Sequence, residues 1–108
     1  HFRSFTYIDD VISNFFKVIN KFKNNKKKIC EVFNIGNPNS ISVKKFIDLI
    51  EKTIKKKALK HYTKKNPEEV LITKANVTRE KKIFGHKITV SLDSGIRKFI
   101  KWHKNYYK

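Results

Sequence analysis

Methionine is absent from all 108 residues of this chain, and several other residue types are scarce. Translation starts with methionine and ordinary chains of this length hold more of it, so we expect the sequence to be a piece of a longer protein. The lone cysteine, Cys30, excludes an internal disulfide framework and is compatible with a reducing cytosol. The only glycines, at positions 36, 85 and 95, are too far apart for a glycine-rich phosphate-binding loop.

Long apolar runs are missing too. No stretch approaches the length of a membrane-spanning helix, and the N-terminal residues lack the stages of a signal peptide. We therefore expect a cytoplasmic protein with no membrane partner. The four histidines are scattered, and none pairs with Cys30 at the spacing of zinc ligands, which argues against a metal site. A hydrophobic content of 39% still allows one small domain with a modest core.

Acidic residues are also few: nine against 26 basic ones, for a formal net charge of +17. This charge invites a nucleic-acid-binding interpretation. Only three basic residues are arginines, however, and arginine is the side chain that makes bidentate bonds to phosphates and base edges. The lysine runs, at 26–28, 55–57, 64–65 and 81–82, fall at separate helix ends and loops. We attribute the lysine and asparagine bias to drift in an AT-rich coding sequence, and keep a nucleic-acid-binding module as an alternative.

Hydrophobic periodicity predicts short strands and about four helices. The strands are expected at 5–8, 29–35 and 58–62. The first helix is expected behind Asp9 as its cap, with an apolar face running from Val11 to Phe22. Ser42 or Ser40 opens a second helix, whose apolar stripe reaches Ile54 and whose last turn holds the lysines at 55–57.

The second half of the chain is predicted to hold two more helices. Asn76 is expected to cap a short helix that runs through Phe84 and closes at Gly85. Ser91 is expected to cap the last helix. The resulting order of elements predicts an α/β or α+β arrangement.

The residues form no complete catalytic constellation. The carboxylate pairs at 9–10 and 68–69 are neighbours in sequence, so their side chains point apart and make no dyad by themselves. No serine, histidine and carboxylate are arranged as in a hydrolase. We predict no catalytic residue in this chain, and reasoning from the residues alone yields a fold class without a reaction.

Several phrases nonetheless follow a single family in order. They are Arg3-Ser4-Phe5-Thr6-Tyr7-Ile8-Asp9-Asp10, Val32-Phe33-Asn34-Ile35-Gly36-Asn37, Asn66-Pro67-Glu68-Glu69-Val70 and Thr73-Lys74-Ala75-Asn76. They resemble the R-D-F-T-Y-I-D-D, V-Y/F-N-I-G-N, Q-P-G-D-V and T-Y-A-D phrases of UDP-glucuronate 4-epimerases, which are extended short-chain dehydrogenase/reductases. The helix at 41–51 and the ending at 84–102 follow the family as well, so the resemblance covers essentially the whole chain.

The resemblance implies that residues 1–108 form the C-terminal, substrate-binding portion of an extended Rossmann-type enzyme. The N-terminal NAD-binding Rossmann region, with its dinucleotide fingerprint and its Tyr-x-x-x-Lys catalytic pair, is absent from this sequence. NAD would be bound by that missing part. The chain would therefore be catalytically incomplete alone, and an NAD-dependent isomerase as part of the longer protein.

The resemblance also implies which residues bind substrate. Arg3 would reach the diphosphate of a UDP-sugar, since its fork suits paired phosphate oxygens. Glu69 would lie near the nucleotide ribose, and Asn66 in the same phrase is taken as a third substrate-binding residue. The sequence departs from the family at four positions, where it has Ser4, Glu68, Glu69 and Asn76.

Further partners and rivals follow from the same resemblance. A homodimer would fit the family, with most of its interface made by helices upstream of this chain. Other nucleotide-sugar enzymes of the superfamily, such as dehydratases and decarboxylases, remain alternatives because the catalytic segment would separate them. A truncated, inactive remnant is the third alternative.

Overall fold

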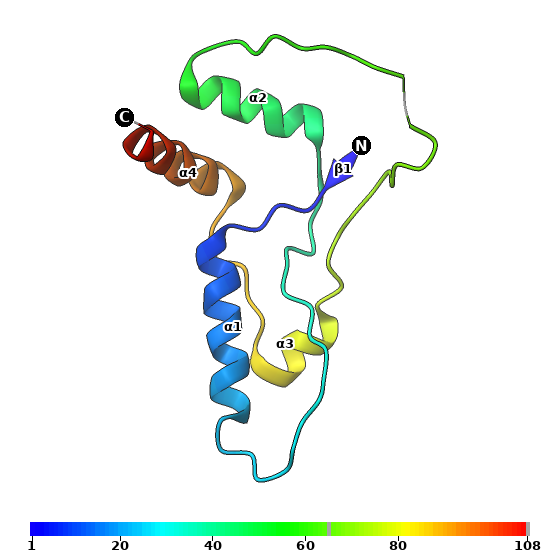
Figure 1. Ribbon diagram of the computed structural model, residues 1–108, viewed down its shortest axis with the longest axis vertical. Coiled ribbons are helices and arrows are strands. Elements are labelled where there is room, and N and C mark those ends of the chain that lie inside the picture. Colours follow the sequence, from blue (N-terminus) through cyan, green and yellow to red (C-terminus); the bar gives the residue numbers. More distant parts are fainter. Residues whose placement is uncertain (65, 108) are drawn as a thin grey trace.

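The computed structural model describes residues 1–64 and 66–107, which contain four helices and two short strands. Figure 1 shows their elongated arrangement. In order, the elements are β1 (Phe2–Arg3), α1 (Ile8–Phe22), β2 (Ile41–Ser42), α2 (Val43–Ile54), α3 (Thr78–Phe84) and α4 (Leu92–Tyr106). The predicted class, short strands with four helices, is confirmed. Of the expected lysine pair at 64–65, the second residue lies outside the described residues.

Three predicted helix boundaries are confirmed by their hydrogen bonds. The hydroxyl of Ser42 accepts from the amide of Lys45 at 3.2 Å, and that of Ser91 accepts from Ser94 at 3.3 Å. Each satisfies an amide that the first helical turn leaves free. Gly85 closes α3 with φ of +71°, a left-handed conformation that glycine adopts without steric cost.

Two predictions at the N-terminal end are wrong. Helix α1 begins at Ile8, so Asp9 lies in its first turn and makes no cap bond; its carboxylate instead lies 3.4 Å from the Lys98 ammonium. The strand expected at 5–8 is replaced by β1, because Phe2 and Arg3 find partners in β2. Near α3, Asn76 does accept a bond from Thr78 at 3.3 Å, one residue before the helix boundary.

The strands expected at 29–35 and 58–62 are not formed. A strand must pair its backbone N–H and C=O groups with a neighbour, and no such neighbour faces these segments within the described residues. The one sheet pairs β1 with β2 in antiparallel register, with Phe2 opposite Ser42 and Arg3 opposite Ile41. Residues 29–35 thus have the β propensity of a strand but no adjacent strand to pair with among the described residues.

The helices pack in two pairs, α1 with α3 and α2 with α4, and aromatic rings attach loop segments to them. Phe33 connects the first pair: its ring stacks on Phe22 at 5.6 Å and meets Phe84 edge-on at 5.5 Å. Phe5 stacks on Phe46 of α2 at 3.9 Å between centroids, which ties the segment after β1 to the second pair. These contacts hold the elements without enclosing a core.

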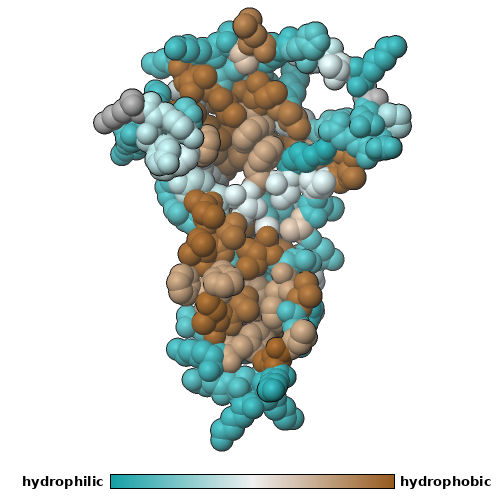
Figure 2. Space-filling view, viewed as in Figure 1, coloured by the Kyte–Doolittle hydropathy of each residue, from teal (hydrophilic) through white to brown (hydrophobic). Residues whose placement is uncertain are grey.

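Buried apolar side chains are scarce among the described residues: Val77 and Ile96. The accessible surface is 9144 Å², against about 6,300 Å² for a compact monomer of this mass. The radius of gyration is 17.4 Å, against about 13 Å for a compact domain of this length. Figure 2 shows apolar residues spread over the part of the surface occupied by α1 and α3. Five large apolar side chains of α1 are half-exposed: Ile8, Ile12, Phe15, Phe16 and Ile19.

In 1–64 and 66–107 the structure contains no helix with both the length and the apolar content needed to cross a bilayer.

Two buried polar side chains of α1, Asp10 and Asn14, attach this helix by hydrogen bonds to the segment before α4. The Asp10 carboxylate accepts from the Thr89 amide at 3.0 Å, the Thr89 hydroxyl at 2.6 Å and the Val90 amide at 2.9 Å. Asn14 donates to the Lys87 carbonyl at 2.8 Å and accepts from the Lys87 amide at 3.0 Å. Burial alone would raise the pKa of Asp10, but the hydrogen bonds from Thr89 and Val90 outweigh it and lower that pKa.

Asp10→Asn is expected to lower the free energy of unfolding by about 1–3 kcal/mol, because an amide nitrogen replaces one acceptor oxygen and leaves a buried N–H unpaired. Urea unfolding of the protein measures this loss. Asp9→Asn is the matched control: its exposed contact with Lys98 is worth about 0.5 kcal/mol or less. Equal effects of the two substitutions would contradict the role given to Asp10.

Candidate functional site

Arg3 and Glu69, which the sequence predicts to bind substrate, lie side by side. The Arg3 Nη2 is 3.3 Å from the Glu69 Oε1, although 66 positions separate them in the sequence. The Arg3 Nη1 donates to the Phe2 carbonyl at 2.9 Å and to the Leu71 carbonyl at 3.4 Å. Both side chains stay partly exposed, at 26% and 45%. A guanidinium in this state is fixed in place while its charge remains open to a ligand.

Backbone pairing explains why the two residues meet. The amide of Phe2 donates to the Leu71 carbonyl at 2.8 Å, and the amide of Thr73 donates to the Phe2 carbonyl at 3.2 Å. The chain after Glu69 therefore runs alongside β1 as a third, bridged segment. His1 adds a second contact, with its Nδ1 3.0 Å from the Glu69 Oε1.

Asn66 shapes the turn that presents Glu69. Its side-chain Oδ1 accepts from the Glu68 amide at 3.1 Å, and its carbonyl accepts from the Glu69 amide at 3.1 Å. This local bonding is the way asparagine commonly initiates a turn. A direct contact of Asn66 with substrate stays a prediction.

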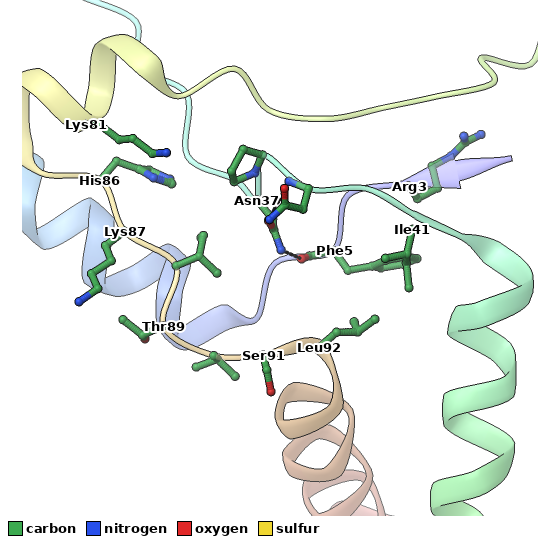
Figure 3. Close-up of a pocket in the computed structure, with 14 residues that line it drawn as sticks. Arg3, Phe5, Asn37, Ile41, Lys81, His86, Lys87, Thr89, Ser91 and Leu92 are labelled. Atoms are coloured by element: carbon green, nitrogen blue, oxygen red, sulfur yellow. Dashed lines mark hydrogen bonds between the residues drawn. The ribbon is translucent and has the colours of Figure 1, made fainter.

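A cavity of about 620 Å³ lies next to Arg3, between the turn before β2 and the segment that leads into α4 (Figure 3). Cationic side chains contribute part of its wall: Arg3, Lys81 and Lys87. The rest combines amide and hydroxyl groups with apolar side chains, among them Phe5, Asn37, Ile41, Ser91 and Leu92. Such a mixture suits an anionic ligand that also carries an apolar or planar group.

His86 lines this cavity and was not singled out by the sequence. It is 5% exposed, and its Nε2 accepts from the Gly36 amide at 3.4 Å, while its Nδ1 has no partner in the part of the chain that the structure describes. Burial lowers the pKa of His86; Glu80 opposes this shift, and Lys17 and Lys81 add to it. The sequence around His86 does not predict that this side chain is buried, because its burial depends on the turn at 36, fifty positions away.

Glu80 braces the same turn from α3. Its carboxylate accepts from the Asn34 amide at 2.9 Å and is 3% exposed. That hydrogen bond lowers the pKa of Glu80 against the opposing effect of burial. Glu80 and His86 together therefore fix residues 34–36, which precede the cavity.

Comparison with known proteins gives these residues a context. No family model matches the chain. UDP-glucuronate 4-epimerase 6 of Arabidopsis thaliana is 34% identical over 114 residues, covering 97% of this chain and 25% of the relative. UDP-glucuronate 4-epimerase 1 of the same plant is 31% identical over 114 residues, covering 97% of this chain and 27% of the relative. This chain is homologous to the C-terminal part of UDP-glucuronate 4-epimerases.

A solved structure agrees with the epimerase homology. UDP-glucuronic acid 4-epimerase from Bacillus cereus, in complex with UDP-glucuronic acid and NAD, superposes with a TM-score of 0.81 at 33% identity. The match covers 98% of this chain and 33% of that one. The chain thus spans less than a third of the length of the curated epimerases that it matches.

The glycines of this epimerase homologue do not fit the pyrophosphate of NAD. A dinucleotide is held where a glycine-rich loop leaves a strand and opens a helix. Here Gly36 precedes the turn before β2, Gly85 closes α3, and Gly95 lies inside α4, where a Cβ would come 3.2 Å from the Tyr7 ring. None of the three opens a helix, so these residues supply no such loop.

His86→Gln is expected to flatten the pH dependence of stability between pH 5 and 7. Because the folded pKa of His86 lies below its ordinary 6.5, the folded state binds fewer protons than the unfolded chain, and stability is lost as pH falls below about 6.5. Glutamine can still accept from Gly36 but does not titrate. Urea unfolding at several pH values measures the slope; His61→Gln, in an exposed segment, is the control that should preserve it. An unchanged slope in His86→Gln would contradict the assignment.

Proposed function

We propose that this chain is the part of a nucleotide-sugar epimerase that holds the UDP end of its substrate, in a longer enzyme most like the UDP-glucuronate 4-epimerases. The observation that carries the proposal is the Arg3 guanidinium, anchored by Glu69 and two carbonyls beside a cavity of about 620 Å³. In that enzyme the chain contributes binding and orientation, and the sugar is transformed by residues outside it.

The positions of the cationic side chains suit binding of the diphosphate of a nucleotide sugar. Arg3 offers a planar fork to paired phosphate oxygens, and Lys81 and Lys87 place further positive charge on the cavity wall. Glu69 can accept hydrogen bonds from ribose hydroxyls while it continues to orient Arg3, since an ionised carboxylate has acceptor sites to spare. This division agrees with the roles that the resemblance implies for both residues.

A second part of the protein would complete the structure. The large accessible surface, the half-exposed apolar face of α1 and the segment 29–35, which pairs with no strand among the described residues, all favour an additional domain that covers them. We propose that this domain is the NAD-binding Rossmann region and that it supplies the cofactor site and the catalytic groups. We further propose a cytoplasmic location for the whole enzyme, with which the lone cysteine of this chain is compatible.

The distribution of lysines gives no support to the nucleic-acid alternative. The run at 26–28 follows α1 at one end of the molecule, whereas the run at 55–57 follows α2 at the other (Figure 1). Two of the cations next to α2 are also engaged: Glu51 lies 3.2 Å from Lys57 and 2.8 Å from Lys60. A nucleic-acid groove would instead gather its free cations along one track.

Arg3→Ala is expected to weaken binding of UDP by about 10- to 100-fold, the loss of a charge-assisted contact of about 1.5–3 kcal/mol. Isothermal titration calorimetry on the whole protein measures it. Arg79→Ala is the matched control, because Arg79 pairs with Glu31 and lies away from this cavity. Unchanged affinity for UDP in Arg3→Ala would refute the proposed site.

The native gene product is expected to be about three times as long as this chain, since the chain covers 33% of the epimerase chain from Bacillus cereus. Mass spectrometry of the endogenous protein, captured through this segment, checks that expectation. The additional sequence should carry a glycine-rich loop after a strand and a Tyr-x-x-x-Lys pair. A native product of only this length would leave the chain without a cofactor site and would count against an epimerase.

A further inference from the structure

Asn37 occupies the turn before β2 and lines the cavity beside Arg3. Three of its bonds go to one segment: its amide donates to the Thr6 hydroxyl at 2.9 Å, its side-chain Nδ2 to the Phe5 carbonyl at 3.2 Å, and its carbonyl accepts from the Ser4 hydroxyl at 2.6 Å. Figure 3 shows the bond from Asn37 to Phe5 at the centre of the cavity wall. The residues that directly follow Arg3 are therefore attached to residue 37 by two backbone bonds and by one bond from its asparagine side chain.

Asn37 is bonded on its other sides as well. Its carbonyl also accepts from the Ala75 amide at 3.3 Å, and its side-chain Oδ1 accepts from the Asn39 amide at 2.9 Å. One residue thus connects the segment after β1, the turn before β2 and the chain that leads from Glu69 to α3. These are the three stretches of backbone that meet around Arg3.

The register of the sheet gives these bonds their importance. The β1–β2 ladder has two residue pairs, and it ends at Arg3 opposite Ile41. A ladder of this length is marginal by itself. The bonds of Asn37 to residues 4–6 continue the pairing of the same two chain segments beyond the ladder. Arg3 therefore lies between the ladder on its N-terminal side and the Asn37 bonds on its C-terminal side. Without the Asn37 bonds, the backbone of Arg3 would be held by the ladder alone.

The turn itself has little freedom to move. A Cβ added at Gly36 would lie 2.9 Å from the Ala75 Cβ, so this turn approaches the neighbouring segment as closely as a glycine allows. His86 holds the amide of Gly36 from behind. Asn37 is thus a rigid point to which the Ser4–Thr6 segment is attached.

We propose that Asn37 is a positioning residue for Arg3: it fixes the backbone on which the guanidinium faces the diphosphate of the ligand. The proposal rests on the proposed function, because it assumes that Arg3 binds phosphate. Asn37 acts through Arg3, so its contribution to UDP binding depends on the presence of the Arg3 side chain. A residue with a merely structural role would contribute whether or not Arg3 is present.

A double-mutant cycle on the whole protein, read out by UDP affinity in calorimetry, tests this dependence. Asn37→Ala removes the side-chain bonds to Phe5 and Asn39 and leaves the backbone bonds of residue 37 in place, so it should weaken UDP binding about fivefold. The double variant Arg3→Ala/Asn37→Ala should bind no more weakly than Arg3→Ala alone. Asn34→Ala is the matched control. It removes one asparagine bond to a backbone carbonyl, that of Asn76, from the same stretch of chain outside the cavity, and it should leave the affinity within about twofold.

The outcomes separate the two proposals. Additive losses in the cycle would overturn the positioning role of Asn37 and leave the proposed function standing. Unchanged affinity in Arg3→Ala alone would overturn both. If Asn37→Ala does not fold, Ser4→Ala replaces it: this variant removes only the hydroxyl bond to the Asn37 carbonyl and should weaken UDP binding a few-fold in the Arg3 background and not in the Arg3→Ala background.

Discussion

The hydrogen bonds that join Asp10 and Asn14 of α1 to residues 87–90 are the interaction on which the arrangement of this chain depends. They link segments more than seventy positions apart, and they do so where the described residues bury hardly any apolar side chains. Inside a low-dielectric contact, paired polar groups of this kind fix one geometry, because any displacement leaves a buried group unsatisfied. The segment that they hold forms the far wall of the cavity beside Arg3.

The same principle operates at the other buried polar groups. Glu51 accepts from the Ala58 amide at 2.9 Å and lies beside Lys60 at 2.8 Å, which turns the chain back at the end of α2. The Lys60 contact is the main reason that the pKa of Glu51 falls to about 2. Glu80 and His86 likewise accept hydrogen bonds from the amides of Asn34 and Gly36 and so hold the turn at 36. The molecule is thus built from extended segments attached at polar points, and the Arg3–Glu69 pair is where two of these segments meet.

Local signals in the sequence predict three helix boundaries correctly, although the cap expected at Asp9 does not form. The caps at Ser42 and Ser91 and the closing glycine at 85 depend on bonds within one helical turn, so neighbouring residues suffice to predict them. The strand at 29–35 was predicted wrongly because pairing requires a partner that the described residues do not provide. Asp9 and Asp10 show the limit most clearly. As adjacent carboxylates they are equivalent in sequence, and only the position of Thr89 makes Asp10 the buried one. The contact between Arg3 and Glu69 was not predicted: the resemblance implied only that both residues bind the nucleotide end of one substrate.

The long connection between α2 and α3 gives the Arg3–Glu69 pair a thermodynamic character of its own. The residues that the structure describes between Lys55 and Val77 carry neither helix nor strand, apart from the bridge of Ile72 to Phe2. The Arg3–Glu69 contact and the backbone bonds of Phe2 to residues 71–73 close this loop within the chain itself, so the entropy of its closure opposes folding and does not oppose ligand binding. Pro67, two residues before Glu69, reduces the conformations that the open loop can sample and so lessens that cost. Sequence changes in the loop therefore alter how firmly Glu69 is held beside Arg3 without altering either side chain.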